Sequence, residues 1–234
     1  MDKNNTIINT QFALFFDSLL DRPDLLWTSI NEKFENIFNT PIIMPVPNEP
    51  PLRDIPMVQM ISNKNMNINI ARSRVDLYFA GSGRQEFKDI KPHLKENLSK
   101  LIQLLNNKNI KFSRVGFVSR FFIEEDNQDE VISNALKEKP TNIQGGDIFE
   151  VFLRFVTRNT MLTFEVNNFT IIEKFTGRIA GEGEKKGILI TRDFNTVPGK
   201  KYEFSTDIIN SFIDEAEKNF QLDKIHNILW LEKK

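Results

Sequence analysis

Apolar and polar residues recur at two spacings in the first half of the chain, and the order of these spacings indicates a fold. Apolar residues three or four positions apart predict amphipathic helices over 23–38 and 87–105. Alternating residues predict strands, which we place over 10–20, 57–62, 66–79 and 110–123. The order strand, helix, two strands, helix, strand is that of a ferredoxin-like βαββαβ unit.

The long strand expected over 66–79 changes phase in its middle. Apolar residues occupy even positions from 66 to 70 and odd positions from 75 to 79. A shift of one residue turns every side chain to the other face of a sheet. The pattern therefore predicts a β-bulge or bend between residues 71 and 74.

The second half alternates between apolar and polar residues without an intervening helix. We expect a four-strand antiparallel meander, with strands over 147–157, 161–166, 169–177 and 187–194. The short connections Arg158-Asn159 and Asn167-Asn168 are typical of hairpins. The connection over 177–187 is longer and rich in glycine.

Further helices are expected before and after the meander. Val131 to Lys139 predicts a short helix that ends at Pro140. Ser205 or Thr206 is expected to cap a helix whose apolar positions continue to Phe220. A last, shorter helix is expected over 222–231.

Together these elements predict an α+β fold in which helices cover one face of a mostly antiparallel sheet. Its first half is ferredoxin-like, and the four-strand antiparallel meander and C-terminal helices follow. We divide the chain into an α+β half over 1–140, with a proline-rich connector at 40–56, and a second half over 141–234. We expect the two halves to pack as one unit, because 234 residues suit one large domain or two small halves.

Composition excludes several classes of function. Lysine and arginine number 31 against 32 aspartate and glutamate, which argues against a non-specific nucleic-acid binder but leaves room for a local basic strip. The absence of cysteine excludes disulfides, cysteine-zinc sites and thiol nucleophiles. Residues 1–10 contain no basic stretch before an apolar run. We expect a cytoplasmic protein without membrane contact.

Few residues could carry catalysis. His93 and His226 lie on separate predicted helices without metal-ligand spacing. Gly81-Ser82-Gly83 lies between a strand and a helix, where an anion could bind, but Glu86 occupies the third glycine position of the dinucleotide fingerprint. We therefore predict no catalytic residue, no metal site and no cofactor, and the sequence favours a protein that is not an enzyme.

One group of side chains could form a binding surface. It consists of arginines at alternating positions of three predicted strands: Arg72, Arg74, Arg114, Arg120 and Arg154. If these faces coincide, the guanidinium groups line one surface, and their geometry suits carboxylates and phosphates. The alternative is an ordinary polar sheet face on which the arginines pair with Glu150, Glu165 or Glu173.

Four segments together resemble a known protein family. They are the strand over 66–77, the helix after it, the strand over 112–121 with its motif Arg114-Val115-Gly116-Phe117, and the closing helix over 205–220. In these segments the chain is similar to a sporadically distributed family of uncharacterised bacterial cytoplasmic proteins of about this length. The resemblance implies no catalytic residue, and a patchy distribution would suit cargo of mobile elements or of phage defence.

Two functional hypotheses follow. In the first, the protein is a non-enzymatic binding or assembly protein, whose sheet and proline-rich connector engage a protein partner or a second copy. Edge strands of the meander could then pair by sheet extension. In the second, the arginine strip binds RNA or a nucleotide phosphate, with a weak nuclease of the ferredoxin-like kind as a variant of this hypothesis.

Overall fold

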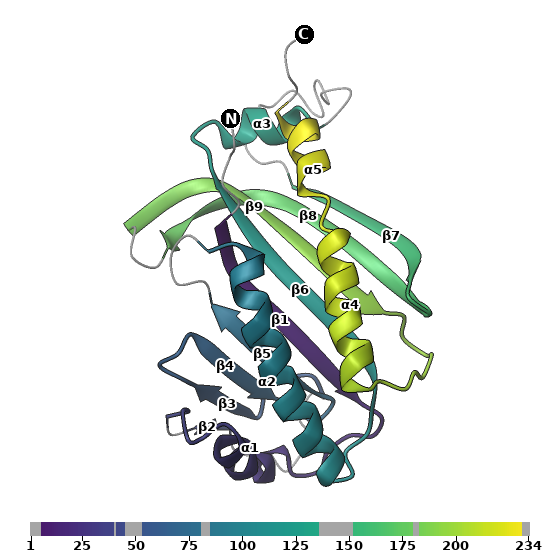
Figure 1. The fold of residues 1–234 in the computed structure, drawn as a ribbon. Helices are drawn as coiled ribbons and strands as arrows, with labels where there is room; N and C mark the ends of the chain where they lie inside the picture. The colour runs from purple at the N-terminus through teal and green to yellow at the C-terminus, as the bar shows by residue number, and fades with distance from the viewer. Residues whose placement is uncertain are drawn as a thin grey trace.

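The structure, a computed structural model, is built on one large antiparallel sheet (Figure 1). It describes residues 6–39, 41–44, 53–80, 85–135, 152–179 and 183–230. The described strands are β1 (Thr6–Phe16), β2 (Ile42–Ile43), β3 (Val58–Ile61), β4 (Met66–Ile70), β5 (Arg74–Ala80), β6 (Phe112–Glu124), β7 (Leu153–Met161), β8 (Phe164–Ile179) and β9 (Gly183–Thr196). Their order in the sheet is β2-β3-β4-β5-β1-β6-β9-β8-β7. The two halves of the chain therefore share one sheet, joined where β6 pairs with β9.

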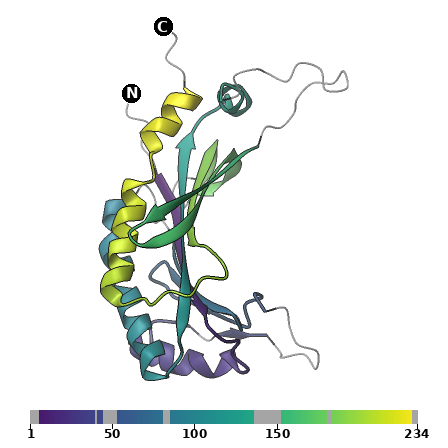
Figure 2. The same cartoon turned by 90° about the vertical axis from the view of Figure 1, so that its right-hand side faces the viewer.

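Helices cover one face of this sheet. The described helices are the 3-10 helix η1 (Pro23–Leu26), α1 (Trp27–Lys33), α2 (Phe87–Asn107), α3 (Gln128–Ser133), α4 (Thr206–Lys218) and α5 (Leu222–Leu229). Figure 2 shows α2 and α4 on the same side of the sheet. In the described part of the chain, no helix crosses the opposite side of β1, β6 and β9 (Figures 1 and 2). The expectation of an α+β protein with a large antiparallel sheet is confirmed.

Phenylalanine rings fill the space between the helices and the sheet. Phe220, which follows α4, has its ring centroid 5.0 to 6.2 Å from those of Phe87, Phe117, Phe121 and Phe194. These residues come from α2, β6 and β9, so one ring joins three elements that are distant in sequence. Phe rings bury a large apolar area and have no polar group that needs a partner.

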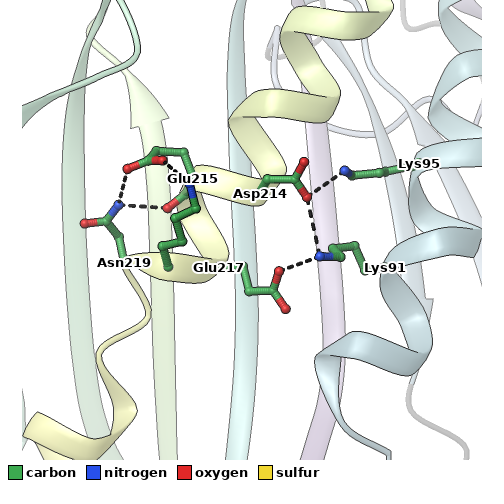
Figure 3. Close-up of polar contacts among 7 residues, drawn as sticks. Lys91, Lys95, Asp214, Glu215, Glu217 and Asn219 are labelled. Atoms are coloured by element: carbon green, nitrogen blue, oxygen red, sulfur yellow. Dashed lines mark hydrogen bonds and ion pairs between the residues drawn. The ribbon is translucent and has the colours of Figure 1, made fainter.

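Capping and ion pairs hold the two long helices in place. The hydroxyl of Ser205 accepts a hydrogen bond from the backbone N–H of Ile208, as expected for the cap of α4. Lys91 of α2 lies 2.6 Å from Glu217 of α4, and Lys95 lies 2.6 Å from Asp214. Figure 3 shows these side chains meeting between the helices.

One arginine is buried on the helix-covered side of the sheet. Arg192 of β9 is 4% exposed, and its Nη2 donates to the side chain of Asn168 and to the carbonyl of Asn219, both at 2.8 Å. Asn219 is the C-cap of α4, where a cation is favoured by the helix dipole. Burial lowers the pKa of Arg192 to about 10, which leaves it charged at neutral pH.

The strand expected over 66–79 is wrong, because it is two strands. Ile70 of β4 pairs with Val75 of β5, and the N–H of Ala71 donates to the carbonyl of Arg74 at 2.9 Å. The bend predicted between residues 71 and 74 is therefore present, as a tight turn and not as a β-bulge. The chain reverses at this turn, so the even-numbered apolar residues of β4 pair with the odd-numbered apolar residues of β5. Both sets therefore point to the same face of the sheet.

The four-strand meander is also wrong in its strand count. The described part contains three strands, because the segments expected at 161–166 and 169–177 belong to one strand, β8. Asn167 and Asn168 lie inside the ladders with β7 and β9. The turn lies instead at Leu162, whose φ is 54°. At the other end, β8 and β9 pair up to Ile179 and Gly183, so most of the glycine-rich connection is strand.

Several helix boundaries differ from the expected ones. The helix expected over 23–38 ends at Lys33, because Glu35 and Asn36 have positive φ. The helix expected at Val131 begins three residues earlier, at Gln128. Two predictions lie outside the described residues: the loop over 81–83 entirely, and the proline-rich connector for most of its length. In the described part of the chain, no helix is both long and apolar enough to cross a membrane.

Candidate functional site

The side of the sheet away from α2 and α4 is called the open face here. Phe12 of β1 and Phe117 of β6 point to the helices, and both are fully buried. Residues at the alternating positions therefore point to the open face. The strand register aligns them in rows, one of which runs Tyr78, Gln11, Val118, Asp193, Phe169 and another Asn9, Arg120, Thr191, Ile171, Arg154.

Four of the five arginines in the predicted strip lie on the open face. They are Arg74 of β5, Arg114 and Arg120 of β6, and Arg154 of β7. The structure does not bring Arg72 to them. Arg72 lies in the turn before β5, where its Nε donates to the carbonyl of Leu20 at 3.0 Å. Its interaction with the segment after β1 fixes the exit of that strand, so placing Arg72 in the strip is wrong.

The open-face arginines differ in their partners. Arg74 donates to Asp76 at 2.9 Å. Among the described residues, no carboxylate lies within ion-pair distance of Arg114, Arg120 or Arg154. Of the glutamates expected to neutralise them, Glu165 pairs with Lys200 at 2.7 Å. Three guanidinium groups on one face therefore form no ion pair with a described carboxylate.

Aromatic and amide groups hold these arginines instead. The guanidinium of Arg114 lies 4.5 Å from the ring centroid of Phe15, and Arg74 lies 5.6 Å from the same ring. Arg154 lies 5.1 Å from the ring of Phe169. Contacts of this kind are favourable and fix the orientation of the guanidinium without neutralising it. Arg120 donates from Nη1 to the side chain of Asn9 at 2.7 Å.

A recess of about 470 Å³ lies at the Phe15 end of the open face and is called the basic recess. Its lining includes five cationic side chains and one carboxylate, namely Arg53, Arg74, Arg114, Lys200, Lys201 and Asp54. The two lysines follow Gly199, whose φ of 88° is a backbone conformation that favours glycine. Burial, followed by the charge of Arg53, lowers the pKa of Arg114, as expected where cations gather.

Two carboxylates of the open face have raised pKa values, and sequence reasoning missed both. Burial raises the pKa of Asp76, even though Arg74 and Gln11 bind its oxygens. Burial also raises the pKa of Asp193 to about 6, against the opposing effects of Asn195, Arg120 and Arg154. The signal in the sequence is weak: Asp76 lies between Val75 and Leu77, whereas Asp193 lies between Arg192 and Phe194. The face is therefore mixed in charge, with its positive end at the basic recess.

Other clusters carry less chemistry. A second recess, of about 420 Å³, lies beside α2 and mixes apolar residues with His93, Asp89 and Glu96. His226 lies on another helix, α5. Within the residues that the structure describes, no group of three or more histidine, aspartate or glutamate side chains could hold a metal ion.

Comparison with known proteins identifies no relative. No family model matches the chain, and no curated protein is significantly similar to it. The resemblance to a sporadically distributed bacterial family therefore stays a prediction, and the function is argued from the site alone.

Proposed function

We propose that the protein is a binding protein that holds single-stranded RNA on the open face of its sheet. The observation that carries this proposal is the presence of Arg114, Arg120 and Arg154 on one face, without a described carboxylate in ion-pair distance. The proposal keeps the hypothesis of a protein that binds and does not catalyse. It takes its ligand from the second of the two sequence-based hypotheses.

The spacing of the arginines favours a polymer over a small anion. Arg114 and Arg120 are six residues apart on β6, which corresponds to about 20 Å along a strand. Arg154 lies three strands further across the sheet, at β7, or roughly 14 Å from β6 at the usual strand spacing. One ligand that contacts all three must extend over this area and carry several negative groups. A nucleic-acid backbone meets both conditions.

The aromatic residues of the face favour a single strand. Tyr78 and Phe169 lie in one row of the open face and are partly exposed. Unpaired bases stack on such rings, whereas a duplex keeps its bases inside. An acidic peptide would use the arginines but gain little from the rings.

We also propose that the first half is a ferredoxin-like unit. The strand order β4-β5-β1-β6, with α1 and α2 between strands, supports this arrangement. Four-stranded sheets of this kind bind RNA on the face that lacks helices in several RNA-recognition modules. The likeness to these modules lies in the fold alone, and a fold does not determine a function. The proposal therefore rests on the positions of the arginines.

Fluorescence anisotropy with a labelled 12-nucleotide RNA tests the proposal. We expect binding at low salt that weakens steeply as salt rises, because phosphate contacts release counterions. The substitutions Arg120→Ala and Arg154→Ala should each weaken binding several-fold and reduce the salt slope by about one. Arg22→Ala is the control, since Arg22 is exposed, precedes η1 and pairs with Asp24 of that helix. No binding at low salt, or an equal loss in the control, would contradict the proposal.

A second candidate function, assembly by sheet extension, is supported by a separate observation. β7 lies at one edge of the sheet, and its Phe155 and Val156 are 50% and 52% exposed. Successive residues of a strand point to opposite faces, so a strand added alongside β7 would contact both. Light scattering after size exclusion tests this: a dimer that Val156→Lys converts to a monomer supports it, and a wild-type monomer at high concentration rules it out.

A further inference from the structure

We infer that the basic recess binds a phosphate monoester dianion. This inference rests on the proposed function, because the monoester would be the terminal phosphate of the RNA that lies on the open face. It adds a second property to the site, namely recognition of an RNA end. The internal phosphates of RNA are diesters with one negative charge, whereas a terminal monoester carries close to two at neutral pH.

The charges that line the recess are unevenly balanced. Lys200 pairs with Glu165 at 2.7 Å, and Lys201 lies 3.9 Å from Asp17, at the limit of an ion pair. Arg114 has no such partner among the described residues. Positive charge therefore accumulates at Arg114, where burial already disfavours it. A bound dianion would relieve this repulsion.

The carboxylate in the lining provides only part of that balance, because its charge raises the pKa of Arg114 less than burial and Arg53 lower it. Asp54 accepts a hydrogen bond from the hydroxyl of Ser73 at 2.5 Å and lies 4.0 Å from Arg53. It therefore holds the turn before β5 and faces Arg53 at the limit of ion-pair distance. The other lining cations pair with carboxylates that lie outside the lining, such as Asp76 with Arg74.

Arg114 also has unused donors. Its Nε donates to the carbonyl of Thr196 at 3.3 Å, while its two Nη atoms make no hydrogen bond to the described residues. Phe15 pairs with Arg114 of β6 on one side and with Arg74 of β5 on the other, so its ring lies between the two guanidinium groups. The two Nη groups of Arg114 offer a fork of N–H donors, which matches the oxygens of a phosphate.

The position and size of the recess suit the end of a longer ligand. About 470 Å³ is more than a phosphate alone needs and falls in the range of nucleotide-sized sites. Phe15 follows Asn9, Gln11 and Ala13 along the open-face side of β1. An RNA chain that enters the recess by its terminal phosphate can therefore continue directly onto the rows that contain Arg120 and Arg154.

Paired oligonucleotides test this inference. One RNA sequence is compared with a 5′-hydroxyl, a 5′-phosphate or a 3′-phosphate, and inorganic phosphate and a nucleoside monophosphate serve as competitors. We expect one terminal phosphate to tighten binding about tenfold, which corresponds to 1.4 kcal/mol. Arg114→Gln should abolish this preference, whereas Arg120→Ala should weaken all RNAs and keep it.

Further variants keep the test independent of folding. Lys201 is exposed at the rim, so Lys201→Gln should leave the fold intact and reduce the preference about threefold; Arg22→Ala should leave it unchanged. Equal affinity for all three RNAs would overturn the inference and leave the proposed function standing. If no RNA binds but a monophosphate binds in an Arg114-dependent way, the proposed function fails and the recess remains an anion site. If neither binds, both fail.

Discussion

The two faces of the sheet are built from the same strands, yet they carry different kinds of side chain. On β6, Phe117 is fully buried beneath the helices, while Arg114 and Arg120 lie on the open face. On β1, the same alternation places Phe12 under the helices and Phe15 beneath two arginines. Successive residues of a strand point to opposite faces. This alternation places the side chains that stabilise the fold on one face and those that we expect to bind RNA on the other.

The open face is more than a solvated surface, because it holds carboxylates that are costly to bury. Asp76 is 1% exposed, and Asp193 has its pKa raised by burial to about 6. Burying an ionised group costs free energy that the core on the other face must offset. The comparison therefore teaches that the helix-covered face stabilises the protein and that the open face retains residues which reduce its stability.

The largest effect is expected from a pair of neighbouring residues on opposite faces. Phe117→Ala should lower the free energy of unfolding by about 3–5 kcal/mol, because it leaves a cavity between the sheet and the helices. Val118→Ala, on the open face, should lower it by roughly 1 kcal/mol or less. Urea unfolding measures both. Similar losses for the two variants would show that the faces do not differ in their contribution to stability.

A second substitution sharpens the comparison on the open face itself. The pKa of Asp193 is raised from 3.8 to about 6, so the folded state favours the protonated form, and stability declines as pH rises through this window. Asp193→Asn cannot ionise and should raise the free energy of unfolding at pH 8 by at most about 3 kcal/mol. The gain should disappear near pH 4, where the aspartate is protonated in the folded protein.

The same variant should tighten RNA binding at pH 8, since it removes a negative charge near Arg120 and Arg154. Urea unfolding at several pH values and anisotropy at pH 8 give the two readouts. A stability gain that does not depend on pH would argue against the ionisation of Asp193 as its cause.

A smaller effect is expected where α4 begins. Ser205→Ala removes the side-chain acceptor for the N–H of Ile208 and should lower the free energy of unfolding by about 1 kcal/mol. RNA affinity should not change, because the cap belongs to the helical layer. Ser205→Asp supplies another capping acceptor and should restore most of the stability. A changed affinity in the alanine variant would break the separation of the two faces.

The smallest effect is expected between the two long helices. Asp214→Asn removes the charge that faces Lys91 and Lys95 (Figure 3). Partly exposed ion pairs contribute little, so the loss should be about 0.5–1 kcal/mol and should shrink in high salt. Unfolding in low and in high salt measures it. A salt-independent loss would indicate that hydrogen bonds or packing, and not charge, join the helices.

Much of the sheet could be predicted from alternation, because burial on one face imposes a period of two. The segment 112–124 shows this best, since its pattern already placed Arg114 and Arg120 on the face opposite Phe117. Turns were harder to predict. Leu162-Thr163 forms a tight turn without a residue typical of turns, whereas Asn167-Asn168 resembles a turn but pairs on both sides within the sheet.

The basic recess could not be predicted, because it depends on pairing between distant strands. Lys200 and Lys201 follow β9, and they reach Arg114 because β9 pairs with β6. Arg53 comes from the turn that precedes β3. No spacing in the sequence indicates that these segments meet. Alternation in three strands was enough to predict that most of the arginines share one face. It could not predict which of them form ion pairs with carboxylates.

The central place of β1 has a consequence for how the protein is made. The hydroxyl of Thr10 lies 3.3 Å from that of Ser119, a partner that the ribosome adds 109 residues later. β1 leaves the ribosome before β6, so one of its edges stays unpaired until β6 has been synthesised. Long-range pairing of this kind slows folding, and an unpaired strand is prone to aggregate meanwhile. A nascent chain that ends before residue 124 lacks part of β6, which is the strand that pairs with the second edge of β1.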